Sequence, residues 1–232
     1  TIFVSCGMLL ISDGILLLFL PLPGSNKKQE TVVATSTEPK HKLHFTSASV
    51  AAILIGFTSS TTFMLWLNCN QELGTSYGIK DPSTLQSFYA AGPAVAVLAT
   101  AQLMRMGLKN TSILILYPSI SIVMLALCYF IQAPFILYIG SFVIGYAAAG
   151  GVLQLATATT INFFPFNKGL ATSMCMFASS IANYAMLSLA AHITGASSSN
   201  APRLIILLNI IVTLIGVVLA VIVRKGKKQV AD

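Results

Sequence analysis

The 232-residue sequence is too apolar for a soluble domain. Hydrophobic residues make up 56% of it and charged residues only 8%, whereas soluble domains carry about 25% charged residues, and its mean hydropathy is +0.84. A formal net charge of +7 could indicate a nucleic-acid partner, but no stretch gathers basic and aromatic residues on a soluble face, as nucleic-acid binding requires. The composition therefore indicates an integral membrane protein that contacts the lipid bilayer and binds no nucleic acid.

Seven apolar stretches are long enough to cross a membrane. About 20 residues at about 1.5 Å each span the hydrocarbon layer of about 30 Å. The predicted helices cover residues 1–20, 47–67, 85–103, 113–131, 135–162, 169–192 and 204–223. We therefore expect an all-α membrane protein with about seven transmembrane helices.

The first predicted helix contains Asp13, an acid inside an apolar run. It lies about eight residues before Pro21, hence about 12 Å from that end and near the midplane. A charged side chain there costs about 2.5–3.5 kcal/mol on insertion scales. Two interpretations follow: Asp13 is a proton-coupling group, or it is a neutral, hydrogen-bonded carboxyl in a helix contact.

The segment 24–45 differs from its neighbours because it is polar and basic. It carries Lys27, Lys28, Lys40 and Lys42 and a run of Thr, Ser and Ala, which is typical of a flexible linker. We expect a helix at 1–23, this linker, a six-helix bundle at 46–224 and a tail at 225–232. Because the chain starts with Thr1 inside an apolar run, we also expect that residues upstream are missing.

Basic residues predict the orientation in the membrane, since cytoplasmic loops collect Lys and Arg. If the linker is cytoplasmic, eleven of the thirteen basic residues fall on its side and only Lys80 and Arg203 on the other. The eleven are Lys27, Lys28, Lys40, Lys42, Arg105, Lys109, Lys168, Arg224, Lys225, Lys227 and Lys228. We expect a multi-pass protein of the cell membrane with linker and carboxyl terminus in the cytoplasm.

No pattern in the sequence predicts a metal site, a cofactor or an enzyme. The four cysteines stand singly in or beside apolar runs, so we interpret them as small packing residues. His41 and His44 have a spacing that could bind metal on a helix, but they lie in the charged linker without further ligands. Phosphate loops, dinucleotide fingerprints and nucleophile–base constellations are all missing.

Two loops resemble motifs of the major facilitator superfamily. The loop after the helix 85–103 reads MRMGLK and is similar to a degenerate copy of the family's G-x-x-x-D-R-x-G-R-K motif. Arg105, Gly107 and Lys109 match, while Met104 replaces the Asp and Thr100 the first Gly. The loop before the helix 169–192 reads FFPFNKGLA, similar to the family's F-P-x-x-[KR]-G-x-A loop, and includes Lys168.

The resemblance covers essentially the whole chain and implies the family's sixth to twelfth helices. It implies that the bundle at 46–224 is a three-plus-three inverted repeat. It also implies that the last helix of each three is peripheral, which favours the structural interpretation of Asp13 and a lipid-facing helix at 204–223. The family binds solute near the midplane between two six-helix halves, so the missing amino-terminal half is an implied partner.

Several polar side chains inside the predicted helices are candidates for lining a solute cavity. The candidates are Thr61, Asn68, Tyr89, Gln154, Asn183 and Tyr184. Lining a cavity and bonding one helix to another both satisfy buried polar groups, so both interpretations stay open. The glycines at 145, 150 and 151 are interpreted as positions of close helix packing.

The resemblance implies half of a secondary transporter that moves a small solute by alternating access. In this interpretation Arg105, Gly107, Lys109 and Lys168 form the cytoplasmic gate. Two other classes remain open: a seven-helix receptor or sensor, and an accessory membrane subunit without transport. A retinal photosensor would need a Lys in its last helix, and the stretch 204–223 contains none.

Overall fold

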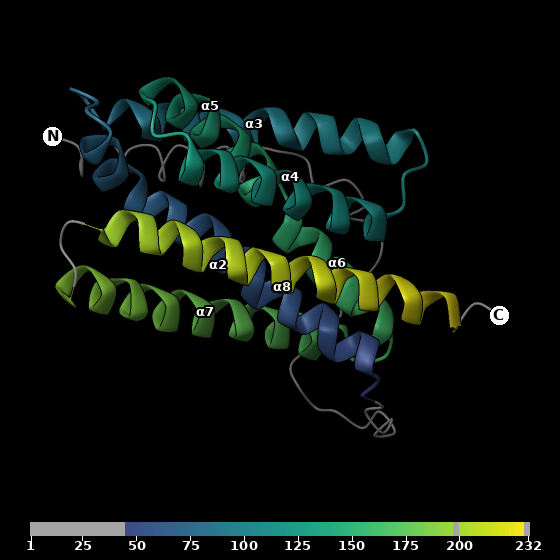
Figure 1. Ribbon diagram of the computed structural model, residues 1–232. Helices are drawn as coiled ribbons and strands as arrows, with labels where there is room; N and C mark the ends of the chain where they lie inside the picture. The colour runs from purple at the N-terminus through teal and green to yellow at the C-terminus, as the bar shows by residue number, and fades with distance from the viewer. Residues whose placement is uncertain (1–44, 197–199, 230–232) are drawn as a thin grey trace, which may run out of the picture. The chain divides into compact units, whose positions relative to one another are not determined.

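A computed structural model describes the backbone of residues 45–196 and 200–229. Asp13, the predicted helix at 1–20, His41, His44 and all of the predicted linker except Phe45 lie outside these described residues. Six helices within them are long and apolar enough to cross a membrane, as the sequence predicts for the bundle. The elements are α2 (Ser47–Ser76), α3 (Thr84–Arg105), α4 (Asn110–Phe130), α5 (Pro134–Ile144), the π-helical segment η1 (Gly145–Ala149), α6 (Val152–Phe163), α7 (Lys168–Ala196) and α8 (Ala201–Gln229). Figure 1 shows their arrangement.

Helix α2 continues nine residues beyond the predicted end at residue 67. Its polar end packs against the start of α3: Leu73 is buried in the same cluster as Leu85, and the Asn68 amide donates to the carbonyl of Met64, 2.9 Å away in its own helix. The helix ends where Gly78 takes a φ of +80°, a left-handed conformation that glycine adopts without strain. At 30 residues α2 is about 45 Å long, so it projects beyond the hydrocarbon layer.

The fifth predicted helix is interrupted rather than continuous. After α5 the chain forms η1, and Gly151 then adopts a φ of +107° before α6 begins. The single span Pro134–Phe163 is therefore two α-helices joined by a π-helical segment and a two-glycine bend at 150–151. Such breaks leave backbone groups unpaired at membrane depth and occur where protein or a water-filled cavity covers them.

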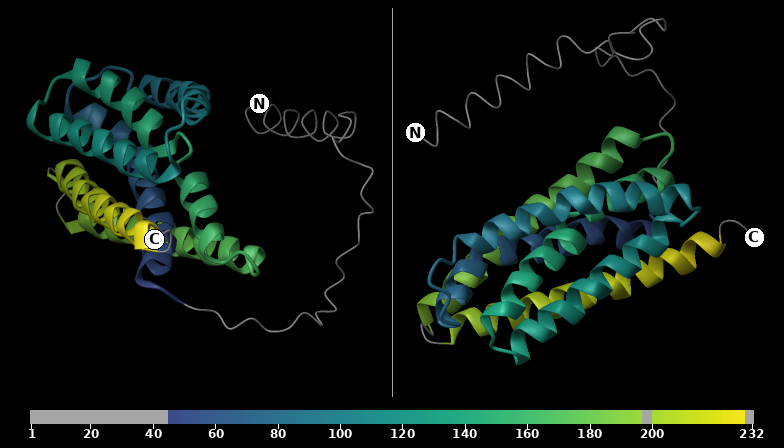
Figure 2. Two further views of the ribbon diagram at one scale, coloured as in Figure 1. Left: turned by 90° about the vertical axis from the view of Figure 1, so that its right-hand side faces the viewer. Right: turned by 90° about the horizontal axis from the view of Figure 1, so that it is seen from above.

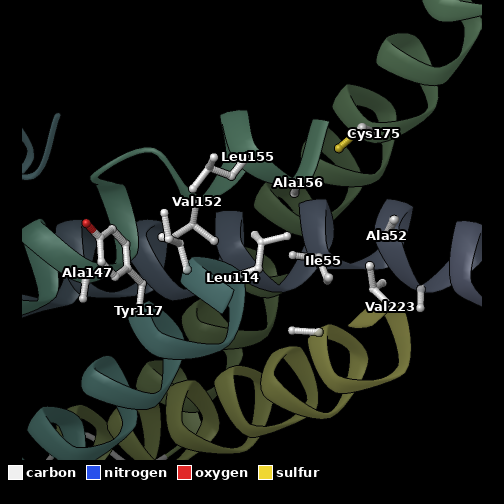
Figure 3. Packing of buried hydrophobic residues seen from close by; sticks show 13 residues of the cluster. Ala52, Ile55, Leu114, Tyr117, Ala147, Val152, Leu155, Ala156, Cys175 and Val223 are labelled. Atoms are coloured by element: carbon white, nitrogen blue, oxygen red, sulfur yellow. The ribbon is translucent and has the colours of Figure 1, made fainter. Parts of the chain in front are cut away.

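Helix α2 lies at the centre of the packing. Ala52 and Ile55 of α2 are buried against side chains of α4, α6 and α8, including Leu114, Ala156 and Val223, and Figure 3 shows this cluster around the α2 ribbon. The helices α2 and α7 approach closely at Gly56, where a Cβ atom would lie 2.7 Å from the Cys175 Sγ. Close approach at a small residue is the usual way that membrane helices pack.

The contacts between helices follow a reciprocal pattern. Helix α2 packs against α7 and α8, and the segment α5–η1–α6 packs against α3 and α4. The two central segments also contact each other, as do α4 and α8. Helices α3 and α7 have the smallest buried shares of the six. Figure 2 shows the same helices from two further directions.

Helix α8 has one apolar exposed face and one polar buried seam. The exposed side chains include Leu207, Ile211 and Val218, as expected for a helix that faces lipid. Asn209 and Thr213 are buried instead, because they face α2, which runs alongside in the opposite direction (Figure 1). The predicted lipid contact therefore describes only one side of α8.

Candidate functional site

The hydroxyl-rich centre of α2 is mostly a structural seam. Thr61 is fully buried and its hydroxyl donates to the carbonyl of Phe57, 3.0 Å away within the same helix. Two neighbours reach other helices: the Ser60 hydroxyl bonds the Ser179 hydroxyl of α7, and Thr62 bonds Thr213 of α8 at 2.8 Å. The first bond satisfies two hydroxyls that have no other side-chain bond among the described residues, whereas Thr62 and Thr213 also donate to carbonyls of their own helices. The Ser60–Ser179 and Thr62–Thr213 bonds join α7 and α8 to α2.

The six cavity candidates differ in exposure. Asn68 and Gln154 are exposed, and Tyr184 is 82% exposed. Tyr89 is 7% exposed and packs in a cluster with Leu85 and Ile144. The structure therefore keeps three of the candidates on the surface of the bundle and places Thr61 and Tyr89 in helix contacts.

Asn183 is intermediate in exposure between the exposed and the buried candidates. Its side chain is partly buried, and its Oδ1 atom has no hydrogen-bond partner among the described residues. It lies one turn beyond Ser179, whose hydroxyl bonds α2. An amide oxygen buried without a partner costs free energy, so Asn183 is a position where water or a ligand would be favoured.

The basic residues of the two loop motifs lie at one end of the bundle. Arg105 ends α3, Lys109 precedes α4 and Lys168 begins α7. The Phe45 ring contacts the Phe164 ring at 5.5 Å, which places the start of α2 beside the second loop. All three basic side chains are exposed, and none forms an ion pair with another described residue.

Gly107 has a conformational reason to occupy its motif position. It adopts a φ of +87° and is exposed, so a residue with a Cβ atom would be strained there. The Leu108 amide donates to the Leu103 carbonyl at 3.1 Å, which closes the turn. Gly107 therefore lets the chain reverse between α3 and α4 and positions Arg105 and Lys109 on either side.

Sequence reasoning missed a chain of hydroxyls beside η1. The Thr100 hydroxyl of α3 bonds the Tyr117 hydroxyl of α4 at 2.7 Å, and Tyr117 bonds Tyr146 of η1 at 3.3 Å. The two tyrosine rings lie 5.3 Å apart. No sequence spacing links these three helices, so only the fold could bring the three residues together.

The opposite end of the bundle holds Arg203, the basic residue at the start of α8. Its guanidinium lies over the Tyr129 ring, 5.6 Å from the centroid, and beside the Gln132 amide, whose oxygen would accept a hydrogen bond from it with the amide turned by 180°. The Tyr77 hydroxyl donates to the carbonyl of Cys128 at 2.9 Å. Burial raises the pKa of the Tyr77 hydroxyl above its usual 10, although the Arg203 charge opposes this rise. Tyr77 therefore stays a neutral donor at neutral pH, and the group ties α2, α4 and α8 together.

Comparisons with known proteins give three transporters as relatives. The chain is 29% identical to the inner membrane transport protein YdiM of Escherichia coli (strain K12) over 179 residues, which are 76% of this chain and 44% of that protein. It is 28% identical to YdiN, another inner membrane transport protein of that strain, over 75% of this chain and 41% of YdiN. It is 31% identical to the uncharacterized MFS-type transporter YfkL of Bacillus subtilis (strain 168), over 69% of this chain and 40% of YfkL.

The matched region spans about two fifths of the length of these relatives. No protein-family model matches the chain. No solved structure matches it either. With six candidate membrane spans and relatives that are all described as transport proteins, the chain is a multi-pass membrane protein and a distant homologue of bacterial MFS-type transporters.

Proposed function

We propose that this chain is the carboxy-terminal half of an MFS-type secondary transporter, which moves a small solute across the cell membrane by alternating access. The similarity to transport proteins carries the proposal, because it covers about three quarters of this chain and only about two fifths of each relative. In this proposal residues 1–23 are the sixth family helix, and α2 to α8 are the seventh to twelfth. The solute is driven by an ion gradient or by its own gradient.

The reciprocal helix contacts support an inverted three-plus-three repeat. In such a repeat α2, α3 and α4 correspond to α5–η1–α6, α7 and α8. The first helix of each set packs against the second and third helices of the other set: α2 packs against α7 and α8, and α5–η1–α6 packs against α3 and α4. Inverted repeats are the usual architecture of each half of an MFS transporter.

The exposed polar residues supply one wall of the solute cavity in this proposal. Asn68, Gln154 and Tyr184 are exposed on α2, α6 and α7, and Asn183 adds an unpartnered amide oxygen. The other half would supply the opposite wall, because solute sites of this architecture lie between the two repeats. Thr61 and Tyr89 would support this wall through packing.

The gate at the basic end acts by electrostatics. Arg105, Lys109 and Lys168 are exposed and have no acidic partner among the described residues. We propose that they pair with acids or helix carboxyl ends of the missing half when the transporter closes on this side. The orientation proposed from the basic residues puts this side in the cytoplasm.

Expression of the two halves as separate chains tests the proposal. This chain should insert into a bilayer alone, because its six candidate spans are long and apolar enough to cross it and the break in the fifth span lies against Ala96 of α3. Uptake of a panel of labelled sugars, amino acids and carboxylates into vesicles should require co-expression with the segment encoded upstream of Thr1. A matched control co-expresses that segment with a variant of this chain truncated after α4. Saturable uptake by this chain alone would disprove the half-transporter function and favour a self-sufficient oligomer.

A further inference from the structure

Two buried polar atoms on α2 have no hydrogen-bond partner among the described residues. They are the indole Nε1 of Trp66, which is a donor, and the amide Oδ1 of Asn70, which is an acceptor. Trp66 is 3% exposed and Asn70 is 1% exposed, so neither bulk water nor lipid reaches them. A polar group buried without a partner costs free energy, so both atoms favour a bound ligand.

The two residues line the same small cavity between α2 and α8. They are one helical turn apart on α2, and the α8 side of the cavity is lined by Pro202, Ile205, Ile206 and Asn209. The cavity has a volume of about 10 Å³, which is at the lower limit of the space that one water molecule requires. A larger ligand would force the two helices apart.

Asn209 adds a third polar group to the lining of this cavity. Its amide nitrogen donates to the Thr62 carbonyl at 3.1 Å. Within the described part of the chain its Oδ1 atom accepts from the Thr213 hydroxyl at 3.4 Å, and that hydroxyl lies closer, at 2.7 Å, to the Asn209 backbone carbonyl. An amide oxygen has two lone pairs, so the Asn209 Oδ1 can accept from a further donor.

A chain of amides determines which atom of the Asn70 side chain is unpaired. The Gln86 amide nitrogen donates to the Leu67 backbone carbonyl at 3.1 Å, and a carbonyl can only accept. The Gln86 Oε1 atom is therefore the one that receives the Asn70 Nδ2 atom, 3.4 Å away. Turning either amide by 180° would bring two acceptors together, so the unpaired atom of Asn70 is an acceptor.

These three groups favour a ligand that both donates and accepts hydrogen bonds. The Trp66 N–H needs an acceptor, whereas the Asn70 and Asn209 oxygens need donors. A metal cation would be repelled by the indole N–H, and an anion would be repelled by the two amide oxygens. Water has two hydrogens and two lone pairs, and a buried water typically makes about three hydrogen bonds.

We propose that this cavity binds one water molecule, which accepts a hydrogen bond from the Trp66 Nε1 and donates to the Oδ1 atoms of Asn70 and Asn209. The water joins α2 to α8 about one turn from the Thr62–Thr213 bond. The Asn70 amide extends this bridge to α3. The site links three helices and does not depend on the proposed transport function.

The indole of Trp66 reports on this site directly, because Trp66 is the only tryptophan in the chain. The chain is labelled with nitrogen-15 tryptophan and purified in detergent micelles. We expect a nuclear Overhauser cross-peak between the single indole proton and a water that tumbles with the protein. Raman spectroscopy gives an independent measurement, since an indole band shifts when the N–H forms a hydrogen bond, and we expect the hydrogen-bonded position.

Two substitutions of the same chemical kind separate this site from a general disturbance of α2. Asn70→Leu replaces a proposed water ligand with an apolar side chain of similar size, so the cross-peak should be lost and the Raman band should move to the position of a free N–H. Asn68→Leu is the matched control, because Asn68 is exposed, and it should leave both signals unchanged. Thr62→Val should also keep the cross-peak, which excludes a signal relayed by exchange of that hydroxyl.

Four results would overturn the proposal. A free N–H band in the wild-type chain would show that Trp66 has no bound partner, and a hydrogen-bonded band without a water cross-peak would show that the partner is a protein atom. Loss of the cross-peak in Thr62→Val would show that hydroxyl exchange produced it. Both signals unchanged in Asn70→Leu would show that Asn70 does not bind the water. The wild-type spectra decide the first two results even where a variant fails to fold.

Discussion

The close approach of α3 to η1 predicts that Gly92→Ala destabilises the bundle. A Cβ atom at position 92 would lie 2.5 Å from the Phe142 carbonyl oxygen and 2.7 Å from the Gly145 carbonyl carbon. Both atoms belong to the backbone of the facing segment, so no flexible side chain can move aside. The helices would have to separate at the point where the interrupted span is held.

The size of the effect follows from two opposing contributions. Overpacking costs about 1–3 kcal/mol, and contact with three backbone atoms, the nearest being the Tyr146 nitrogen, favours the upper end of this range. Replacing glycine by alanine inside a helix raises the free energy of unfolding by about 1 kcal/mol, because alanine has the higher helix propensity. We therefore expect Gly92→Ala to lower the free energy of unfolding by about 2 kcal/mol.

A glycine without neighbours provides the matched control. Gly195 lies in α7, and a Cβ atom there would meet no atom of the described residues within 4 Å. Gly195→Ala should therefore leave stability unchanged or raise it by up to about 1 kcal/mol. The two substitutions are chemically identical, so their difference isolates the helix contact.

Reversible unfolding in mixed micelles with increasing dodecyl sulfate measures both variants. Trp66 is the natural reporter, because it is buried in the same cluster as Leu85 and Tyr89 of α3. Its fluorescence should change at a lower detergent fraction in Gly92→Ala than in the parent protein. Equal midpoints for Gly92→Ala and Gly195→Ala would refute the claim that this glycine allows the close approach.

Three further predictions concern the seam, the gate and the orientation. Thr62→Val and Thr213→Val should show a coupling energy of about 0.6 kcal/mol in a double-mutant cycle, the usual size for a hydrogen bond between membrane helices. In the proposed two-half transporter, Arg105→Ala should lower the transport rate more than the equilibrium affinity for solute, because the proposed gate would bias a conformation without touching the solute. In a cysteine-free chain in intact cells, Ser76→Cys should react with an impermeant thiol reagent and Met106→Cys should not.

Each of these predictions has a result that would contradict it. A coupling energy near zero would show that the 2.8 Å bond contributes nothing beyond the bonds that each Thr makes within its own helix. Equal losses of rate and affinity in Arg105→Ala would argue against gating, and Lys225→Ala at the same end serves as the control. Labelling of Met106→Cys with protection of Ser76→Cys would reverse the proposed orientation.

The positions of the membrane spans could be predicted because bilayer thickness sets a length that apolar runs must reach. The polar end of α2 could not be predicted to be helical, because the apolar run that indicates the helix stops before Asn68. Beyond Asn68 the helix packs against the start of α3, where Leu73 is buried in the same cluster as Leu85. Hydropathy measures transfer into lipid, whereas helix length also depends on such packing and on the turn at Gly78.

The interruption of the fifth span shows another limit of sequence reasoning. The sequence predicts that the glycines at 145, 150 and 151 are packing positions, and Gly145 and Gly150 do meet Tyr89 and Ala96 of α3. The bend itself depends on which glycine takes a positive φ, and Gly151 alone of the three does. The backbone conformation of each glycine depends on contacts between helices that are distant in sequence.

The exposure of the polar candidates carries the strongest physical argument for a missing partner. Gln154 lies in the first turn of α6 near the middle of the membrane span, is exposed, and forms no hydrogen bond with a described residue. An amide in hydrocarbon without a hydrogen bond costs several kcal/mol. Tyr184 presents a similar case, with 82% of its side chain exposed. Lipid supplies no hydrogen bonds to either group, so each requires water or another protein surface. The wall of a solute cavity between two transporter halves would satisfy both requirements, because water fills such a cavity in one state and the partner half contacts it in the other.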